Sequence, residues 1–151
     1  IFFKQKRIGK NSKAFQIFKF RTMKKDTKDI ATHLVKNFEN NILYSGHFFR
    51  KYSVDELPQL INILKGDMKF IGPRPALYNQ FDLIELRKSF KVDLIKPGIT
   101  GWAQVNGRDE VSIKDKVKLD AYYIKNHNLF LDFKIVLLTL YKVINKSGVK
   151  G

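Results

Sequence analysis

The sequence predicts a small α+β domain, in which a short N-terminal β-hairpin is followed by several short and amphipathic helices. Strand-forming residues gather before residue 22, whereas apolar residues recur at helical spacing from residue 57 onward. With 151 residues, of which 44% are hydrophobic and 13% aromatic, the chain can bury one core and does not have the composition of a disordered segment. We therefore expect one folded domain.

The first 25 residues predict a β-hairpin with a basic face. They contain nine Lys or Arg residues and no acid, and the turn signal Gly9–Ser12 separates two stretches with strand preference. Lys19 and Arg21 are two positions apart in the second stretch, so they share one strand face. On the residues alone, this face is either a solvated charged surface or a surface that meets phosphate.

The next segment carries no recognisable chemistry. Residues 28 to 37 predict an amphipathic helix. His33 and His47 are interpreted as surface or packing residues, because no second ligand stands at the spacing of a zinc site. The chain has no Cys, which excludes a disulfide framework and thiolate chemistry.

The segment RKYSVDELPQLINILKGDMKFIGPRP, residues 50 to 75, is the most informative part of the chain. It predicts a short buried helix that ends at Gly66, because one helical face carries all of its apolar positions. These positions are Leu57, Leu60, Ile61 and Leu64. Ser53 and Glu56 have the spacing of a capping box, whereas Pro58 should loosen the first turn because it lacks an N–H group.

The same segment ends in a predicted short strand, residues 68 to 71, and a stiff turn, Gly72–Pro75. Two prolines fix φ on both sides of Arg74, so its guanidinium projects from a backbone with little freedom and suits bidentate phosphate binding. An isolated Asp-Glu pair after a Ser is usually only a helix start, and Pro-Arg-Pro is usually only a turn. Their combination over so few residues favours a site.

The remaining elements follow from periodicity and punctuation. The pattern predicts helices over residues 77 to 90, 112 to 126 and 129 to 145, the last one interfacial or in the core. Residues 95 to 108 are rich in glycine, which permits close approach to a ligand, and Gln104, Asn106 and Arg108 offer polar groups there. This segment is either a structured substrate loop or an ordinary loop with Trp102 in the core. Asp132, in an apolar background, either caps its helix or belongs to a site.

The charge of the chain limits the classes of partner. With 29 basic and 14 acidic residues, the formal net charge is +15, which predicts a polyanion: nucleic acid, an anionic membrane surface or a phosphorylated substrate. No run reaches the about 18 apolar residues that a spanning helix needs. The chain begins at Ile1 with what reads as the end of a strand, so we expect residues 1–151 to be an N-terminally truncated domain.

Adjacent carboxylates restrict the chemistry. Neighbours on a helix diverge by roughly 100°, so Asp55 and Glu56 cannot face each other as the acid and base of a glycosidase. A carboxylate can instead attack phosphorus to give an acyl phosphate, and Mg²⁺ held by Asp55, Glu56 and phosphate oxygens would screen the repulsion between anions.

Four separated blocks resemble the bacterial sugar transferases, the monotopic phosphoglycosyl transferases. They are FKQKRIGKNSKAFQIFKFRTM, SVDELPQLINILKGDMKFIGPRP, KPGITGWAQVNGR and YYIKNHNLFLDFKIVLLTL, and together they run through nearly the whole chain. The resemblance implies a small monotopic membrane-associated catalytic domain on the cytoplasmic face of the bacterial inner membrane. Members carry a re-entrant hydrophobic helix upstream, and this chain as given begins after that position.

The resemblance also implies an activity. A sugar phosphate passes from a UDP-sugar to polyprenol (undecaprenyl) phosphate, UMP leaves, and Mg²⁺ is the cofactor. The residue at Asp55 is the nucleophile, and Glu56 assists the metal and the charge balance. Phosphate is then held by Arg50, Arg74, Lys19 and Arg21. Gln104, Asn106, Arg108 and Asp132 belong to the substrate region.

Two other interpretations compete with this one. A basic nucleic-acid-binding module would explain the charge and the N-terminal aromatic residues, although no nucleic-acid motif is present and a carboxylate pair would repel DNA phosphate, so we expect no nucleic-acid partner. A polybasic scaffold on a membrane surface is the other.

Overall fold

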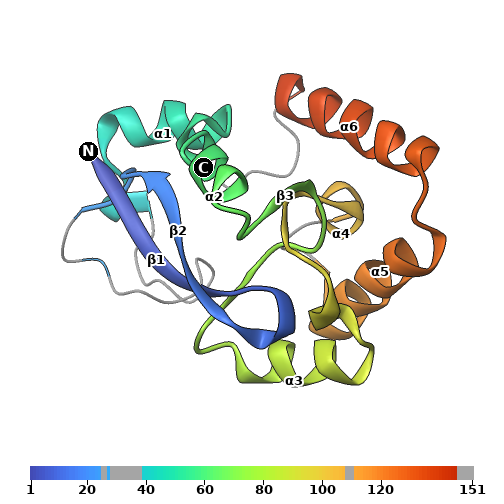
Figure 1. Ribbon diagram of the computed structural model, residues 1–151. Helices are drawn as coiled ribbons and strands as arrows, with labels where there is room; N and C mark the ends of the chain where they lie inside the picture. The colour runs from blue at the N-terminus through green and yellow to red at the C-terminus, as the bar shows by residue number, and fades with distance from the viewer. Residues whose placement is uncertain (25–26, 28–38, 108–110, 146–151) are drawn as a thin grey trace.

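The N-terminal hairpin forms as predicted and gains a third strand from the middle of the chain. In the computed structural model, which describes residues 1–24, 27, 39–107 and 111–145, β1 (Phe2–Ile8) pairs antiparallel with β2 (Ala14–Phe20). The register runs from Phe2 opposite Phe20 to Ile8 opposite Ala14. The short strand β4 (Ala76–Leu77) pairs with the other edge of β1, so the sheet order is β2-β1-β4 (Figure 1).

A second, parallel pair of strands adjoins the Gly72–Pro75 turn. β3 (Lys69–Ile71), which the sequence predicted, pairs with β5 (Gly98–Thr100). A Cβ atom at Gly98 or at Gly101 would collide with the backbone of Gly72. These glycines thus let two backbone segments of the protein approach each other, rather than a ligand. Part of the predicted loop over residues 95 to 108 is therefore regular structure.

The helices follow the predicted pattern in the last third of the chain and depart from it earlier. The α-helices are α1 (Tyr44–Lys51), α2 (Gln59–Leu64), α3 (Phe81–Ser89), α4 (Trp102–Val105), α5 (Ile113–Asn126) and α6 (Leu129–Ile144). The 3-10 turns are η1 (Lys10–Ser12), η3 (Glu39–Asn41), η4 (Val54–Glu56) and η5 (Val92–Leu94).

The starts of the helices explain these agreements and differences. Ser112 accepts a side-chain hydrogen bond from the Asp115 N–H group, and Asn128 accepts one from Leu131, so α5 and α6 begin where predicted. The predicted helix over residues 77 to 90 begins only at Phe81, because Leu77 pairs with Arg7 in the sheet. The helix predicted for residues 28 to 37 lies outside the described residues.

The apolar side of α2 is exposed, which makes the prediction of a buried helix wrong. Leu60 and Leu64 are 42% and 88% exposed, whereas Gln59 and Asn62 are 1% and 0% exposed. The Asn62 side chain accepts a hydrogen bond from Phe18 N (3.0 Å) and donates one to the backbone oxygen of Gln16 (2.8 Å). Because β2 is an edge strand, its backbone groups need such partners.

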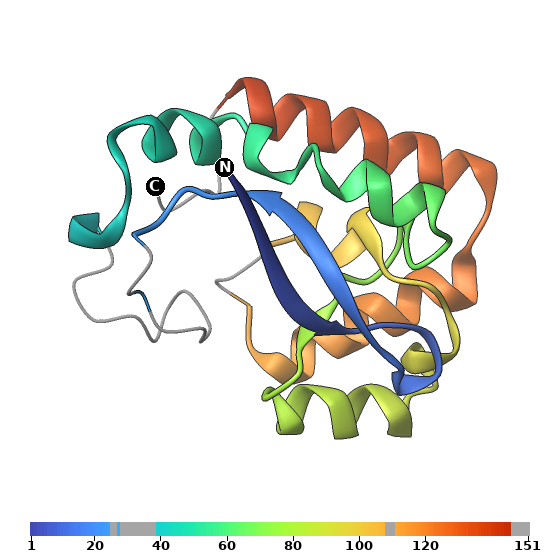
Figure 2. The ribbon, with the colours of Figure 1, turned by 60° about the vertical axis from the view of Figure 1, so that its left-hand side comes forward.

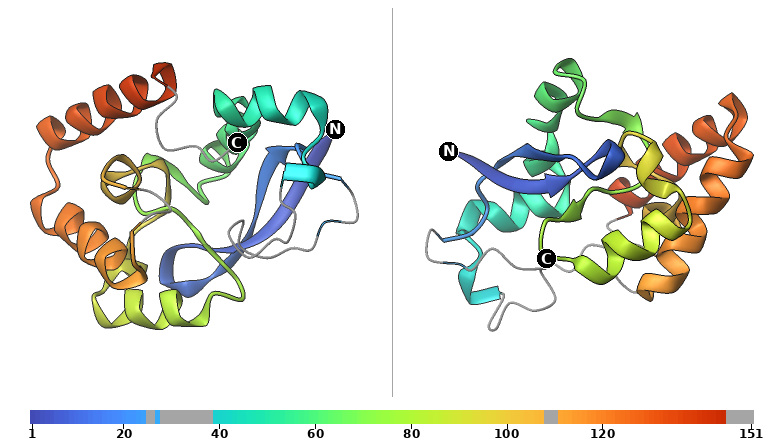
Figure 3. Two further views of the ribbon diagram at one scale, coloured as in Figure 1. Left: turned by 180° about the vertical axis from the view of Figure 1, so that it is seen from behind. Right: turned by 60° about the horizontal axis from the view of Figure 1, so that its bottom comes forward.

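Two apolar clusters fill the interior. One consists of Ala76, Leu83, Val92 and Val117, and the other of Val105, Tyr123, Leu131 and Ile135. Helices α1, α2 and α6 lie along one side of the molecule (Figures 1 and 2). The view from behind places α3 on the opposite side (Figure 3). Within the described residues, no helix is both long and apolar enough to cross a bilayer.

Candidate active site

Asp55 and Glu56 lie on the 3-10 turn η4, which connects α1 to α2. Ser53 has a left-handed backbone (φ 54°), and its side chain makes no capping hydrogen bond, so the predicted capping box does not form. An N-cap residue needs an extended backbone, which Ser53 does not have. Pro58 separates η4 from α2, which begins at Gln59. Asp55 and Glu56 are 9% and 8% exposed, so both carboxylates are buried.

Glu56 is held by two cations from different elements. Lys19 of β2 lies 3.0 Å from Glu56 Oε1. Arg74, from the turn after β3, donates to the same oxygen at 2.6 Å and to Oε2 at 3.4 Å. Arg74 therefore approaches the Glu56 carboxylate with the two-pronged geometry that suits a planar anion.

Asp55 has quite different surroundings. Its carboxylate has no hydrogen-bond or ion-pair partner among the described residues. Burial raises the pKa of Asp55, the positive charges of Lys19, Arg50 and Arg74 oppose that rise, and the negative charge of Glu56 adds to it. Asp55 is thus a buried carboxylate among cations that are not bonded to it.

Lys19 is itself perturbed by the site. The pKa of Lys19 is lowered to about 8, chiefly by burial; the positive charges of Arg74 and Arg7 contribute to the lowering, and the negative charge of Glu56 opposes it. The ammonium group of Lys19 therefore loses its proton at a pH much closer to neutrality than an exposed lysine does.

The two other predicted phosphate ligands differ in position. Arg50, in the last turn of α1, donates to Thr22 Oγ1 at 3.4 Å, and its charge acts on Asp55. Arg21 follows the end of β2 and lies over the Phe3 ring, 5.4 Å from its centroid. The structure therefore gathers Lys19, Arg50 and Arg74 around the carboxylates, whereas the described contact of the Arg21 side chain is with β1.

The predicted substrate residues of the later segment are spread over several environments. Gln104 lies on α4, and both polar atoms of its side chain are buried with no partner among the described residues. Asn106 donates to the Trp102 oxygen at 2.8 Å and so closes the end of α4. Arg108 lies outside the described residues.

Asp132 makes its hydrogen bonds at the junction of α5 and α6. It accepts from the Tyr123 hydroxyl (2.9 Å) and lies 3.1 Å from His127 Nε2. The pKa of Lys69 in β3 is lowered by burial, and the negative charge of Asp132 opposes part of that lowering. Since Asn128 is the N-cap of α6, the capping role considered for Asp132 belongs to Asn128.

Sequence reasoning missed two residues that support this site. Asn62 joins α2 to β2 and thereby fixes the strand that carries Lys19. Arg87 of α3 donates to the backbone oxygen of Arg74 at 2.7 Å. An Asn in the middle of an apolar helical stretch was the only signal for Asn62. Arg87 looked like an ordinary residue of a polar helix face.

The carboxylate pair was also expected to bind Mg²⁺. Among the described residues there is no group of three or more His, Asp or Glu side chains that could hold a metal ion. Mg²⁺ in phosphate-transferring sites usually takes only one or two carboxylates and completes its shell with substrate phosphate and water. The unpartnered carboxylate of Asp55 fits that requirement, whereas Glu56 is already engaged by Lys19 and Arg74.

The fold and site define a small α+β protein in which basic side chains of the kind that bind phosphate surround a buried pair of carboxylates. Residues 1–146 match the model of the family described as bacterial sugar transferase. The chain belongs to that family. Among the interpretations that the charge left open, this membership favours the enzyme over a nucleic-acid module or a scaffold.

Several relatives cover nearly the whole chain. The chain is 44% identical to "Uncharacterized sugar transferase EpsL" of Bacillus subtilis (strain 168), over 99% of this chain and 73% of EpsL. It is 36% identical to the UDP-N-acetylgalactosamine-undecaprenyl-phosphate N-acetylgalactosaminephosphotransferase of Aeromonas hydrophila, over 99% of this chain and 37% of that protein. It is 38% identical to the UDP-glucose:undecaprenyl-phosphate glucose-1-phosphate transferase of Escherichia coli (strain K12), over 98% of this chain and 34% of that protein. The chain thus spans only about a third of these two longer relatives.

Proposed function

We propose that this chain transfers a sugar 1-phosphate from a UDP-sugar to polyprenol (undecaprenyl) phosphate and releases UMP, as the first membrane step in the assembly of a bacterial glycan. The names of the relatives support the substrate classes. The observation that carries the proposal is the contrast between the two carboxylates: Glu56 is bound by Lys19 and Arg74, whereas Asp55 has no partner in the described part of the chain. A nucleophile needs that availability.

In the first half-reaction, a carboxylate oxygen of Asp55 attacks the phosphorus that bears the sugar. A bond between Asp55 and phosphorus forms, the bond from phosphorus to the bridging diphosphate oxygen breaks, and UMP leaves with that electron pair. Arg50 and Arg74 attract the phosphate oxygens and so offset the repulsion between two anions. Glu56 keeps Lys19 and Arg74 in place for this task.

In the second half-reaction, an oxygen of polyprenol phosphate attacks the same phosphorus. The bond to Asp55 breaks, the carboxylate is restored, and the product is a polyprenyl diphosphate sugar. Splitting the transfer in this way lets one set of cations stabilise two similar displacements.

Mg²⁺ is proposed as the cofactor. When bound, it would neutralise charge on the substrate diphosphate, with Asp55 as its first protein ligand and Glu56 beside it. The residues of the chain would still have to orient the phosphates and keep Asp55 ionised. Arg21 remains a proposed phosphate ligand, and Gln104, Asn106, Arg108 and Asp132 remain proposed contacts of the substrate region.

A membrane surface, on the cytoplasmic face of the bacterial inner membrane, is the proposed location of the reaction. The three helices along one side of the molecule, α1, α2 and α6, expose many large apolar side chains, and we call these residues the apolar face. They include Phe48, Leu60, Ile61, Leu64, Leu129, Phe130, Phe133, Leu137, Leu140, Tyr141 and Ile144. Exposed apolar area of this kind, next to a strong positive charge, suits an interfacial site on anionic lipid.

The proposal is tested by UMP release from a panel of UDP-sugars with Mg²⁺, in the presence and absence of polyprenol phosphate. We expect one UDP-sugar to give turnover with the lipid. Without the lipid, the same UDP-sugar should give one equivalent of UMP and a phosphosugar adduct on Asp55 by mass spectrometry. Absence of UMP release from every UDP-sugar, with a folded protein and lipid present, would contradict the proposal.

A further inference from the structure

The turn that carries Arg74 has few hydrogen-bond donors of its own and depends on donors from other parts of the chain. Pro73 and Pro75 have no N–H groups, so the turn has few donors with which to form hydrogen bonds of its own. Its three consecutive carbonyl oxygens are nevertheless all bonded, each to a donor from another part of the chain. Gly98 N donates to the oxygen of Pro73 at 3.0 Å, and two guanidinium groups take the other two oxygens.

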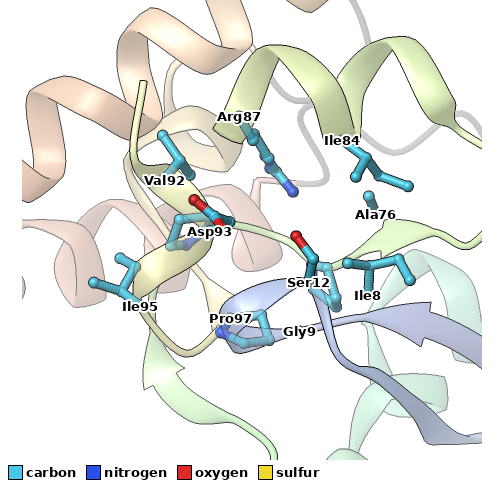
Figure 4. A pocket seen from close by; sticks show the side chains of 12 residues that line it. Ile8, Gly9, Ser12, Ala76, Ile84, Arg87, Val92, Asp93, Ile95 and Pro97 are labelled. Atoms are coloured by element: carbon cyan, nitrogen blue, oxygen red, sulfur yellow. The ribbon is translucent and has the colours of Figure 1, made fainter. Parts of the chain in front are cut away.

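The first guanidinium group belongs to Arg87 of α3. Its NH1 donates to the oxygen of Arg74 at 2.7 Å, while Nε and NH2 donate to Asp120 Oδ2 of α5 at 3.1 and 2.7 Å. Arg87 is 7% exposed and Asp120 is 2% exposed. Figure 4 shows Arg87 between Val92 and Ile84, on the wall of a small pocket that reaches the hairpin turn at Ile8 and Gly9.

The second guanidinium group belongs to Arg7 of β1. Its NH1 donates to the oxygen of Pro75 at 3.1 Å, and its Nε donates to Gln5 Oε1 at 2.8 Å. Gln5 is 8% exposed and Arg7 is half-buried, so this anchor is partly shielded from solvent. Two arginines from two different elements therefore hold the peptide oxygens of adjacent residues, Arg74 and Pro75.

We propose that Arg87, oriented by Asp120, is a positioning residue of the active site: it fixes the backbone of Arg74 so that the Arg74 guanidinium reaches the reacting phosphate and Glu56. This proposal rests on the proposed function. Burying an ion pair contributes little net stability, since the desolvation of both charges offsets their attraction. A buried Arg–Asp pair whose spare donor ends on the turn of the active site is better explained by the orientation that it provides.

The geometry requires an arginine. Arg87 uses donors on opposite sides of one planar group, two for Asp120 and one for the Arg74 oxygen. A lysine keeps the charge beside Asp120 but lacks the rigid fork that spans both acceptors. Arg87→Lys should therefore preserve the fold and loosen the turn.

The test compares Arg87→Lys with Lys88→Met, a control on the same helix whose ion pair with Glu85 is exposed. We expect Arg87→Lys to lower the rate of UMP release by about 100-fold, the cost of misplacing a reacting group by about 1 Å. Lys88→Met should stay within about twofold of the wild type, as expected for a surface change. In an Arg74→Ala background, the further change Arg87→Lys should have almost no effect, because Arg87 acts through Arg74. Equal losses in both backgrounds would overturn the proposal.

A double variant guards against a simple loss of folding. Arg87→Met with Asp120→Leu replaces the buried pair by apolar side chains, which proteins often tolerate. We expect a normal unfolding transition and the same loss of UMP release. Full activity of this folded variant would overturn the positioning role, and so would failure of both this variant and Arg87→Lys to fold, since the pair would then serve folding alone.

A second measurement separates this proposal from the proposed function. If the wild type released no UMP, the proposed function would have failed, and the positioning role would be judged by NMR. The side-chain Nε–H signal of Arg74, assigned with Arg74→Lys, should be sharp in the wild type and in Lys88→Met. It should be broadened or lost in Arg87→Lys. An unchanged signal in Arg87→Lys would overturn the inference.

Discussion

At the scale of single residues, Asp55 and Glu56 are chain neighbours with different electrostatic surroundings. The Lys19 and Arg74 side chains stabilise the ionised form of Glu56 by direct contact. The same cations reach Asp55 only through space, and burial still raises its pKa. A carboxylate that is less stabilised by contacts is the better nucleophile, so the structure favours different roles for the two residues.

This contrast leads to a prediction about substitution. Asp55→Asn should lower UMP release by at least about 1,000-fold, because the amide keeps the shape and loses the nucleophile. Glu56→Gln should also impair the reaction strongly, since Lys19 and Arg74 lose their anchor. Mass spectrometry of Glu56→Gln with a UDP-sugar should find any adduct on Asp55. An adduct on Glu56 in the Asp55→Asn protein would reverse the two roles.

Lys19 leads to a prediction about pH. Attack requires ionised Asp55, so the rate should fall as the pH drops through the raised pKa of Asp55. Charge stabilisation requires protonated Lys19, so the rate should also fall as the pH rises through about 8. Single-turnover UMP release should therefore give a bell-shaped profile. Lys19→Arg should remove the alkaline limb near that pH, because a guanidinium keeps its proton. An unchanged alkaline limb would assign it to another group.

Arg74 leads to a prediction about geometry. Two of its nitrogens contact the two oxygens of Glu56, at 2.6 and 3.4 Å. Arg74→Lys keeps the charge and loses the fork, so we expect the rate of UMP release to fall by about tenfold or more. Wild-type rate and substrate affinity in Arg74→Lys would show that the residue acts only as a point charge.

At the scale of elements, the buried side of α2 is polar and its exposed side is apolar. Asn62 provides the hydrogen bonds that join this helix to β2, and Lys19 of that strand contacts Glu56. The buried side of α2 therefore mainly fixes the strand that carries Lys19, rather than adding large apolar side chains to the core. The apolar side remains available to a lipid surface.

Asn62→Leu tests this connection. The substitution leaves the N–H of Phe18 and the oxygen of Gln16 without their partner, so we expect the free energy of unfolding to fall by about 2 kcal/mol. The matched control is Leu64→Gln on the same helix, which alters an exposed side chain and should change stability by less than about 0.5 kcal/mol. Urea unfolding measures both. Equal stability of Asn62→Leu and the wild type would mean that water or another group replaces the amide.

The sequence predicted the elements that depend on nearby residues, and it failed where the structure depends on residues far away in the chain. The hairpin, β3, α5 and α6 depend on alternation, turn residues and caps within a few positions, and all of them form. Periodicity located the apolar side of α2 but not its surroundings, because these depend on β2, more than 40 residues earlier. The capping box failed because Ser53 adopts a left-handed backbone.

The candidate site was predictable in part for a similar reason. Lys19 and Arg74 were named from their residue types and positions, and Arg50 from the family resemblance; the fold brings the charges of all three to Asp55. Arg87 was missed because its partner Asp120 is 33 positions away on another helix. No local pattern distinguishes a buried arginine on a short helix from an exposed one.

At the scale of the whole molecule, a net charge of +15 and the apolar face should act together on a membrane. Each Lys or Arg near an anionic leaflet contributes roughly 1 kcal/mol, and this attraction weakens with salt. A large apolar side chain contributes about 1.5 to 3 kcal/mol only when it is fully buried; side chains that enter the interface in part contribute a smaller, salt-independent attraction, which does not hold the domain once the charge attraction is screened. The two contributions can therefore be separated by experiment.

We predict that the 151-residue chain binds liposomes that contain anionic lipid at low salt and is largely released at high salt, as a reversibly held peripheral domain would be. Replacing two residues of the apolar face, Leu64→Gln with Phe130→Gln, should weaken binding at low salt by at least about tenfold, because each lost side chain removes apolar burial. The matched control is Phe81→Gln, which changes an exposed aromatic residue on α3, on the opposite side of the molecule, and should leave binding unchanged. Liposome co-sedimentation over a salt series measures all three proteins. Equal weakening by Phe81→Gln would show that α1, α2 and α6 do not form the docking side, and no binding of the wild type at low salt would remove the membrane surface from the proposed function.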